Sequence, residues 1–117
     1  MELKNQVCSL KLAKELKKLG VKQDSLFGWQ VWKDLDTNRR TKMLLAVENY
    51  NYGDYYSAYT VAELGNILSK YGNYITWMTN KNKWAITRMN YMEFPELDSD
   101  TEANARAKCL IYLLKMG

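Results

Sequence analysis

Histidine is absent from this 117-residue chain, and its absence narrows the chemistry that the chain can perform. Without an imidazole the protein has neither the usual general base nor the Ser-His and Cys-His pairs that activate a nucleophile. It also lacks the commonest metal ligand. No catalytic set emerges from the remaining residue types. We therefore expect a protein that is not an enzyme and that uses no metal or other cofactor.

Cysteine and long apolar runs are also scarce. The chain has two cysteines, Cys8 and Cys109, each on an apolar stretch in or next to a predicted helix. Buried free thiols in a reducing compartment are the expected outcome, rather than a disulfide framework. The first residues show no signal-peptide pattern, and no apolar run approaches the roughly 18–20 residues of a membrane span. We expect a cytoplasmic protein with no membrane contact.

The glycines and acidic residues do not complete a ligand-binding loop. The six glycines form neither GxGxxG nor GxxxxGK[ST]. Residues 98–102 (DSDTE) open like a calcium loop, but Ala103 stands where that loop needs glycine and Cys109 where it needs glutamate. Acidic residues at a helix N-terminus are stabilising by themselves, so we interpret these acids as part of a helix start and not as a calcium site.

Aromatic residues with a polar tip are the most prominent feature that is present. Nine tyrosines and four tryptophans stand against two phenylalanines. Such side chains suit half-buried sheets and contact surfaces. The length and the hydrophobic content of 47% are those of a single globular domain, which we assign to residues 1–117.

Helical spacing of apolar residues and capping signals predict three helices. The first covers residues 7–20, with Ser9 as N-cap and Gly20 closing the C-terminus. The second covers residues 61–70 and begins with a capping box formed by Thr60 and Glu63. Tyr59 and Leu64 are spaced for the accompanying hydrophobic staple.

The third helix is predicted over residues 101–115. Ser99 and Glu102 are spaced for a second capping box, with Asp100 as the competing cap. The apolar stripe of this helix includes closely spaced alanines, which allow its first half to approach a sheet.

Alternating patterns predict two antiparallel hairpins. Residues 25–33 and 41–48 read as strands joined by turn-forming residues 34–40. Residues 73–79 and 83–89 read as strands around a tight turn at residues 80–82. An edge strand at residues 91–94 is a further candidate.

The second hairpin has an apolar face that the pattern does not fix completely. We expect Ile75 and Trp77 on one face, with Trp84 and Ile86 across from them. The predicted order is therefore α–β–β–α–β–β–(β)–α. It indicates an α+β fold with an antiparallel sheet of four to five strands covered by three helices, on one face or on both.

A cluster of tyrosines after the first hairpin is the best signal for a binding site. Tyrosine supplies large contact area at low entropic cost, and tyrosine with arginine nearby can also stack bases and hold phosphates. The alternative is that some of these tyrosines fold back on the core. The candidate binding residues are Trp32, Arg39, Arg40, Lys42, Tyr50, Tyr52, Tyr55 and Tyr56.

The net charge of +4 comes entirely from the first half of the chain. Residues 1–50 hold ten Lys and Arg against six acids, whereas residues 51–117 hold seven of each. The excess is too small to require a nucleic-acid partner.

Three segments of the chain resemble a group of small uncharacterised proteins encoded by phages and prophages. The segments are VCSLKLAKELKKLGVKQDSLF at residues 7–27, YSAYTVAELGNIL at 56–68 and DTEANARAKCLIYLL at 100–114. The last two are also similar in layout to the phage ABA-sandwich domain, which implies a sheet between helical layers. The resemblance implies a small phage accessory protein in the cytoplasm of a bacterial host, and it transfers no site residue.

Three functions fit these observations. The first is a non-catalytic inhibitor that binds and blocks a component of bacterial host defence, as anti-CRISPR proteins do, with a host protein or nucleoprotein complex as partner. The second is a sponge for a nucleotide immune signal, with a homodimer completing its pocket. The third is a weak nucleic-acid-binding module that uses the lysines of the first helix.

Overall fold

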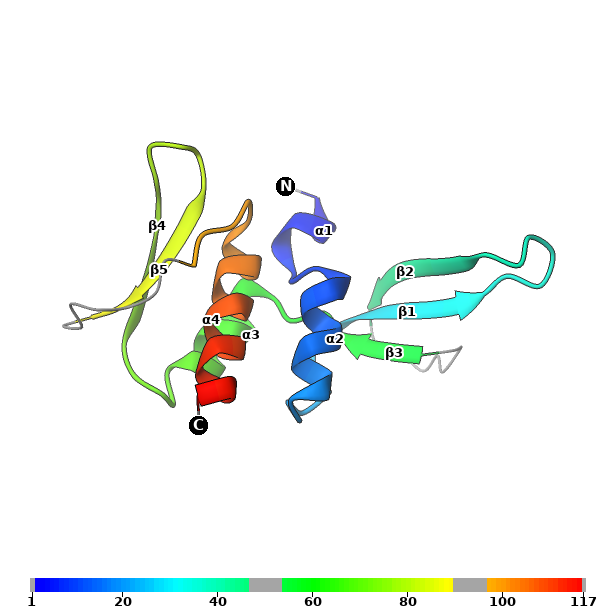
Figure 1. The fold of residues 1–117 in the computed structure, drawn as a ribbon, viewed down its shortest axis with the longest axis horizontal. Coiled ribbons are helices and arrows are strands. Elements are labelled where there is room, and N and C mark those ends of the chain that lie inside the picture. Colours follow the sequence, from blue (N-terminus) through cyan, green and yellow to red (C-terminus); the bar gives the residue numbers. More distant parts are fainter. Residues whose placement is uncertain (1, 47–53, 90–96, 117) are drawn as a thin grey trace.

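The computed structural model describes residues 2–46, 54–89 and 97–116 and shows an α+β fold. These residues form four helices and five strands in the order α-α-β-β-β-α-β-β-α (Figure 1). Their bounds are α1 Leu3–Gln6, α2 Leu10–Lys18, β1 Phe27–Lys33, β2 Arg40–Ala46, β3 Asp54–Ser57, α3 Val61–Leu68, β4 Tyr74–Met78, β5 Trp84–Arg88 and α4 Glu102–Met116.

The described strands form two antiparallel sheets, so the expectation of one sheet with four to five strands was wrong. One sheet has the order β2-β1-β3, and the other is the hairpin β4-β5. The tyrosine-rich link supplies β3, which pairs with β1 and occupies the edge where the second hairpin could have added. The helices lie between the two sheets (Figure 1), unlike a sheet between helical layers.

The helix predicted over residues 7–20 is shorter in the structure, where α2 begins at Leu10 because Val7 and Cys8 are extended, and the short helix α1 before them was not predicted. The backbone N–H of Cys8 donates to the Tyr59 carbonyl at 2.9 Å, which removes these residues from the helical bonding pattern. Ser9 caps α2 as expected, because its side chain accepts from the Leu12 N–H. Gly20 follows the helix with a φ of 89°, as its position predicted.

The predicted capping box of α3 is confirmed. The Thr60 hydroxyl accepts from the Glu63 N–H at 3.1 Å, and the Glu63 carboxylate accepts from the Thr60 N–H at 3.0 Å. The same carboxylate accepts from the Ser25 hydroxyl at 2.8 Å and from the Leu26 N–H at 3.1 Å. Glu63 therefore joins the start of α3 to the segment that leads into β1.

The predicted cap of α4 was wrong. The Thr101 hydroxyl caps this helix by accepting from the Asn104 N–H at 3.1 Å. Ser99 is buried instead, because its backbone N–H and carbonyl pair with those of Trp84 at 2.8 and 2.7 Å. Asp100 forms an ion pair with Lys83.

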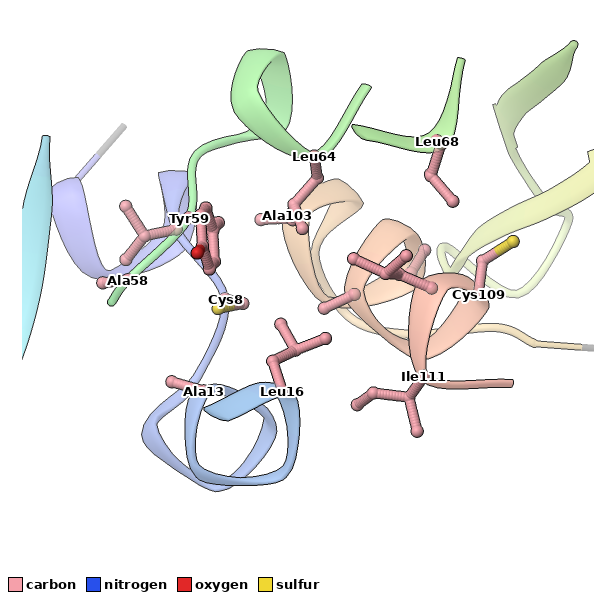
Figure 2. Packing of buried hydrophobic residues seen from close by; sticks show 14 of the residues in the cluster. Cys8, Ala13, Leu16, Ala58, Tyr59, Leu64, Leu68, Ala103, Cys109 and Ile111 are labelled. Carbon is pink, nitrogen blue, oxygen red and sulfur yellow. The ribbon is translucent and has the colours of Figure 1, made fainter. Parts of the chain in front are cut away.

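The core is built around α4, which contacts α1, α2, α3 and both strands of the second sheet. Figure 2 shows α4 facing Leu16 of α2 on one side and Leu64 of α3 on another. Ala103, Ala105 and Ala107 are fully buried, and their small side chains let the neighbouring elements approach closely. Both cysteines lie in this core as free thiols, as expected.

The predicted faces of the second hairpin were also wrong. Ile86 lies directly opposite Thr76 and is 3% exposed. Ile75 and Trp77 are 46% and 43% exposed because they point to the opposite face, away from the core. Asn82 adopts a φ of 56° in the turn that sets this register. The candidate edge strand at residues 91–94 lies outside the described residues.

Candidate binding surface

The three-stranded sheet projects away from the helices (Figure 1), and we call β1, β2, β3 and the turn at residues 34–39 the arm. Two bonds anchor its base. The Trp29 indole N–H donates to the Cys8 carbonyl at 2.9 Å, and the Lys17 ammonium donates to the Tyr55 carbonyl at 2.7 Å. The turn is closed by the backbone N–H of Asp34, which donates to the Arg39 carbonyl at 2.8 Å.

The strand register divides the arm into two faces of different chemistry. Side chains of directly paired residues share a face, and neighbours along a strand alternate between faces. The face that meets α2, here called the basic face, carries Trp29, Val31, Lys33, Arg40, Lys42, Leu44, Asp54 and Tyr56. The opposite face, here called the apolar face, carries Gly28, Gln30, Trp32, Thr41, Met43, Leu45, Tyr55 and Ser57.

The outer part of the basic face concentrates positive charge. Lys33 lies directly opposite Arg40, and Lys42 follows two positions along the same strand. Like charges in direct cross-strand positions repel each other. Within the described chain, none of these three side chains forms an ion pair. Asp54, on the third strand, is the one acid on this face.

The inner part of the basic face packs aromatic rings under lysine side chains. The Lys17 and Lys14 ammonium groups lie 4.9 and 5.7 Å from the centre of the Tyr56 ring. The Lys42 ammonium lies 5.6 Å from the centre of the Trp29 ring. These distances fit cation–π contacts. Tyr56 therefore helps to attach the arm to α2, in addition to any contact with a ligand.

The apolar face carries large side chains and no charge. The Tyr55 ring lies over Gly28, where an added Cβ would come within 2.1 Å of it. Trp32 and Leu45 are half-buried, and Met43 is 46% exposed. Leu35 in the turn is 97% exposed, which places an apolar side chain at the end of the arm.

The structure brings the predicted binding residues onto one arm but not onto one surface. Arg40, Lys42 and Tyr56 lie on the basic face, whereas Trp32 and Tyr55 lie on the apolar face. Arg39 is exposed in the turn. Two further candidates, Tyr50 and Tyr52, lie outside the described residues.

Three lysines on the basic face or next to it, Lys33 on β1 and Lys14 and Lys17 on α2, were not among the predicted residues. Lys33 ends the first strand of a predicted hairpin, so pairing that strand with its partner would have placed it near Arg40. Lys14 and Lys17 belong to the lysine-rich side of the first predicted helix, which reads as a solvated face. Their approach to Tyr56 depends on the pairing of β3 with β1, and no local pattern indicates that pairing.

Both thiols and Asp100 have structural roles. Burial raises the pKa of the Cys8 thiol to about 11 and that of Cys109 to about 12, so both stay protonated at neutral pH. The Lys83 ammonium lowers the pKa of Asp100 below its usual value. Among the residues described, no group of three or more acids and cysteines is arranged to hold a metal ion.

Four cavities in the described part of the chain lie away from the arm. The largest, about 610 Å³, opens where α3 and α4 begin and is lined in part by Trp84, Thr60 and Thr101. The other three measure about 250 to 370 Å³. No helix among the described residues is long and apolar enough to cross a membrane.

Comparison with known proteins gives no further guide to this surface. No family model, no curated protein and no solved structure matches the chain.

Proposed function

We propose that this protein is a non-catalytic binding protein that captures a macromolecular partner with its arm. The observation that carries the proposal is the separation of cations and apolar side chains onto opposite faces of a projecting sheet. Such an element can make charged contacts with one face and apolar contacts with the other. Apolar contact area next to a charged surface is typical of protein recognition. The partner in this proposal is a protein or nucleoprotein component of bacterial host defence, which the protein blocks by binding.

A nucleotide sponge is the weaker of the two leading hypotheses. It requires a concave pocket beside Tyr55 and Tyr56, whereas both lie on a strand of a sheet and the four cavities described above are lined by other side chains. A flat sheet with separated charges suits an extended partner better than a small ligand, which proteins usually hold in a concave site. The arm therefore favours the inhibitor.

Charge reversal on the arm tests this proposal. In a pull-down from lysate of a bacterium that carries active defence systems, the double variant Arg40→Glu/Lys42→Glu should recover the partner at least tenfold less than the wild type, because its basic face is lost. In the same host, expression of the wild type should restore phage plaque formation and this variant should not.

The matched control is Lys70→Glu/Lys81→Glu, which makes the same charge change at exposed lysines outside the arm. This control should behave as the wild type does in both measurements. Equal recovery of the partner by all three proteins would show that the arm is not the contact surface.

A further inference from the structure

The outer strand of the arm, β2, has one edge that pairs with no other strand among the described residues. Among the described strands, β2 pairs only with β1, and β3 takes the other side of β1. The backbone groups along an unpaired edge are available to another strand. The arm therefore ends in a row of N–H and C=O groups along β2.

Two hydrogen bonds identify which residues of β2 offer these groups. Asp34 bonds to Arg39 across the turn, so bonding toward β1 alternates along β2 through Thr41, Met43 and Leu45. The bond from the Ala58 N–H to the Phe27 carbonyl agrees, because it shows that odd-numbered residues of β1 bond toward β3. The outward backbone groups are therefore those of Arg40, Lys42, Leu44 and Ala46.

The side chains along β2 alternate with the same period of two residues, between the basic face and the apolar face. Arg40 and Lys42 offer their backbone groups outward and place their cationic side chains on the basic face. The intervening Thr41, Met43 and Leu45 place uncharged side chains on the apolar face. Lys33 and Arg40 form a pair without mutual hydrogen bonds, the arrangement in which opposed side chains lie closest.

We propose that the edge of β2 accepts an extended acidic segment of a partner protein as a fourth strand of the arm. The segment carries carboxylates at alternate positions beside Arg40 and Lys42, and apolar side chains at the intervening positions beside Met43 and Leu45. Its backbone pairs with the outward groups of β2, as in other cases of strand addition. This inference rests on the proposed function and names the chemistry of the partner.

The features of this edge favour an acidic segment over a second copy of the chain or a nucleic acid. A second copy of the chain would bring Arg40 and Lys42 against the same cations of its own β2, which repel them. A nucleic acid would meet the cations but would use neither the row of backbone groups nor the apolar side chains. An acidic strand uses all three features.

A labelled eight-residue peptide in which glutamate alternates with valine provides the probe, with fluorescence anisotropy on the full chain as the measurement. Lys42→Pro removes one outward N–H without removing a bond to β1, and Lys42→Ala removes the charge alone. We expect the wild type to bind the peptide, and Lys42→Pro to bind it at least tenfold more weakly than Lys42→Ala does.

A second peptide keeps the test independent of how the proline variant folds. When two valines of the probe are replaced by proline, the charge is unchanged but the peptide cannot form a strand, so the wild type should bind it at least tenfold more weakly. A peptide in which lysine replaces glutamate should not bind. Equal binding of the valine and proline peptides would overturn strand addition.

Three further results would also overturn the inference. They are equal affinity of folded Lys42→Pro and Lys42→Ala for the probe, tighter binding of a single-stranded oligonucleotide that Lys42→Pro leaves unchanged, and a dimer of the chain that Lys42→Pro dissociates. The proposed function fails separately, when Arg40→Glu/Lys42→Glu still recovers the partner. Strand addition fails, while the proposed function stands, when Arg40→Glu/Lys42→Glu no longer recovers the partner in the pull-down but Lys42→Pro recovers as much of it as Lys42→Ala does.

Discussion

Gly28 shows at the scale of one residue how the apolar face of the arm is packed. A Cβ at this position would lie 2.1 Å from the Tyr55 ring, so Gly28→Ala forces the ring to move. We expect a loss of about 1–3 kcal/mol in the free energy of unfolding, the usual cost of overpacking. Urea denaturation of the purified variant measures this loss.

The background variant Tyr55→Ala isolates the cause. Because the three atoms nearest to the added methyl group all belong to the Tyr55 side chain, Gly28→Ala should cost less than about 0.5 kcal/mol once that ring is removed. The same loss in both backgrounds would mean that backbone conformation at residue 28, and not the tyrosine ring, requires glycine.

The start of α3 shows at the scale of an element how one side chain joins two parts of the fold. Thr60→Ala removes a cap and should cost about 1 kcal/mol. Glu63→Ala should cost about 2–3 kcal/mol, because it removes the acceptor of the Thr60 and Leu26 N–H groups and the link to the Ser25 hydroxyl, which keeps the Ala58 carbonyl as acceptor. Urea midpoints of the two variants compare these losses, and Glu63→Gln, which keeps one acceptor oxygen, should fall between them.

Equal destabilisation by Thr60→Ala and Glu63→Ala would contradict this account, since it would reduce Glu63 to its part in the capping box. The capping box itself was predicted from four consecutive residues. The contacts of Glu63 with the segment before β1 were not, because Ser25 lies 38 positions away in the sequence.

The buried thiols affect the stability of the whole molecule at high pH. Burial raises the pKa of Cys8 from 9.0 to about 11 and that of Cys109 to about 12. Their stabilising effect is complete below pH 9 and is lost as the pH rises from the unfolded toward the folded pKa, because the unfolded state releases its protons first. At pH 10 each thiol should lower the free energy of unfolding by about 1 kcal/mol.

Urea denaturation at pH 8 and pH 10 checks this expectation. The variant Cys8→Ala/Cys109→Ala should lose less stability than the wild type between these two values, whatever its stability at pH 8. A parallel fall of both proteins would show that other groups set the high-pH limit. Tyr59, whose pKa burial raises to about 12, remains in both proteins and cancels in the comparison.

The sequence by itself determined the local features of this protein. Caps, turns and hairpins depend on residues within a few positions of each other, so Ser9, Thr60 and Asn82 acted as their surroundings predicted. The α+β class was also predicted correctly, because it follows from the presence of both helices and antiparallel hairpins. The chemistry of the arm was visible in part, because Arg40 and Lys42 lie in a strand with clear alternation.

The tertiary structure decided how these features combine. The pairing of β3 with β1 joins segments about 25 residues apart, so it depends on the packing of the chain and not on a local pattern. With that pairing the described strands form a three-stranded and a two-stranded sheet, and Lys17 lies over Tyr56, while the pairing of β1 with β2 places Trp32 on the face opposite to Arg40 and Lys42. Alternation of residue types in the sequence shows which side chains of a strand share a face. It does not show with which strand, and in which register, that strand pairs, and this pairing decides which face is buried.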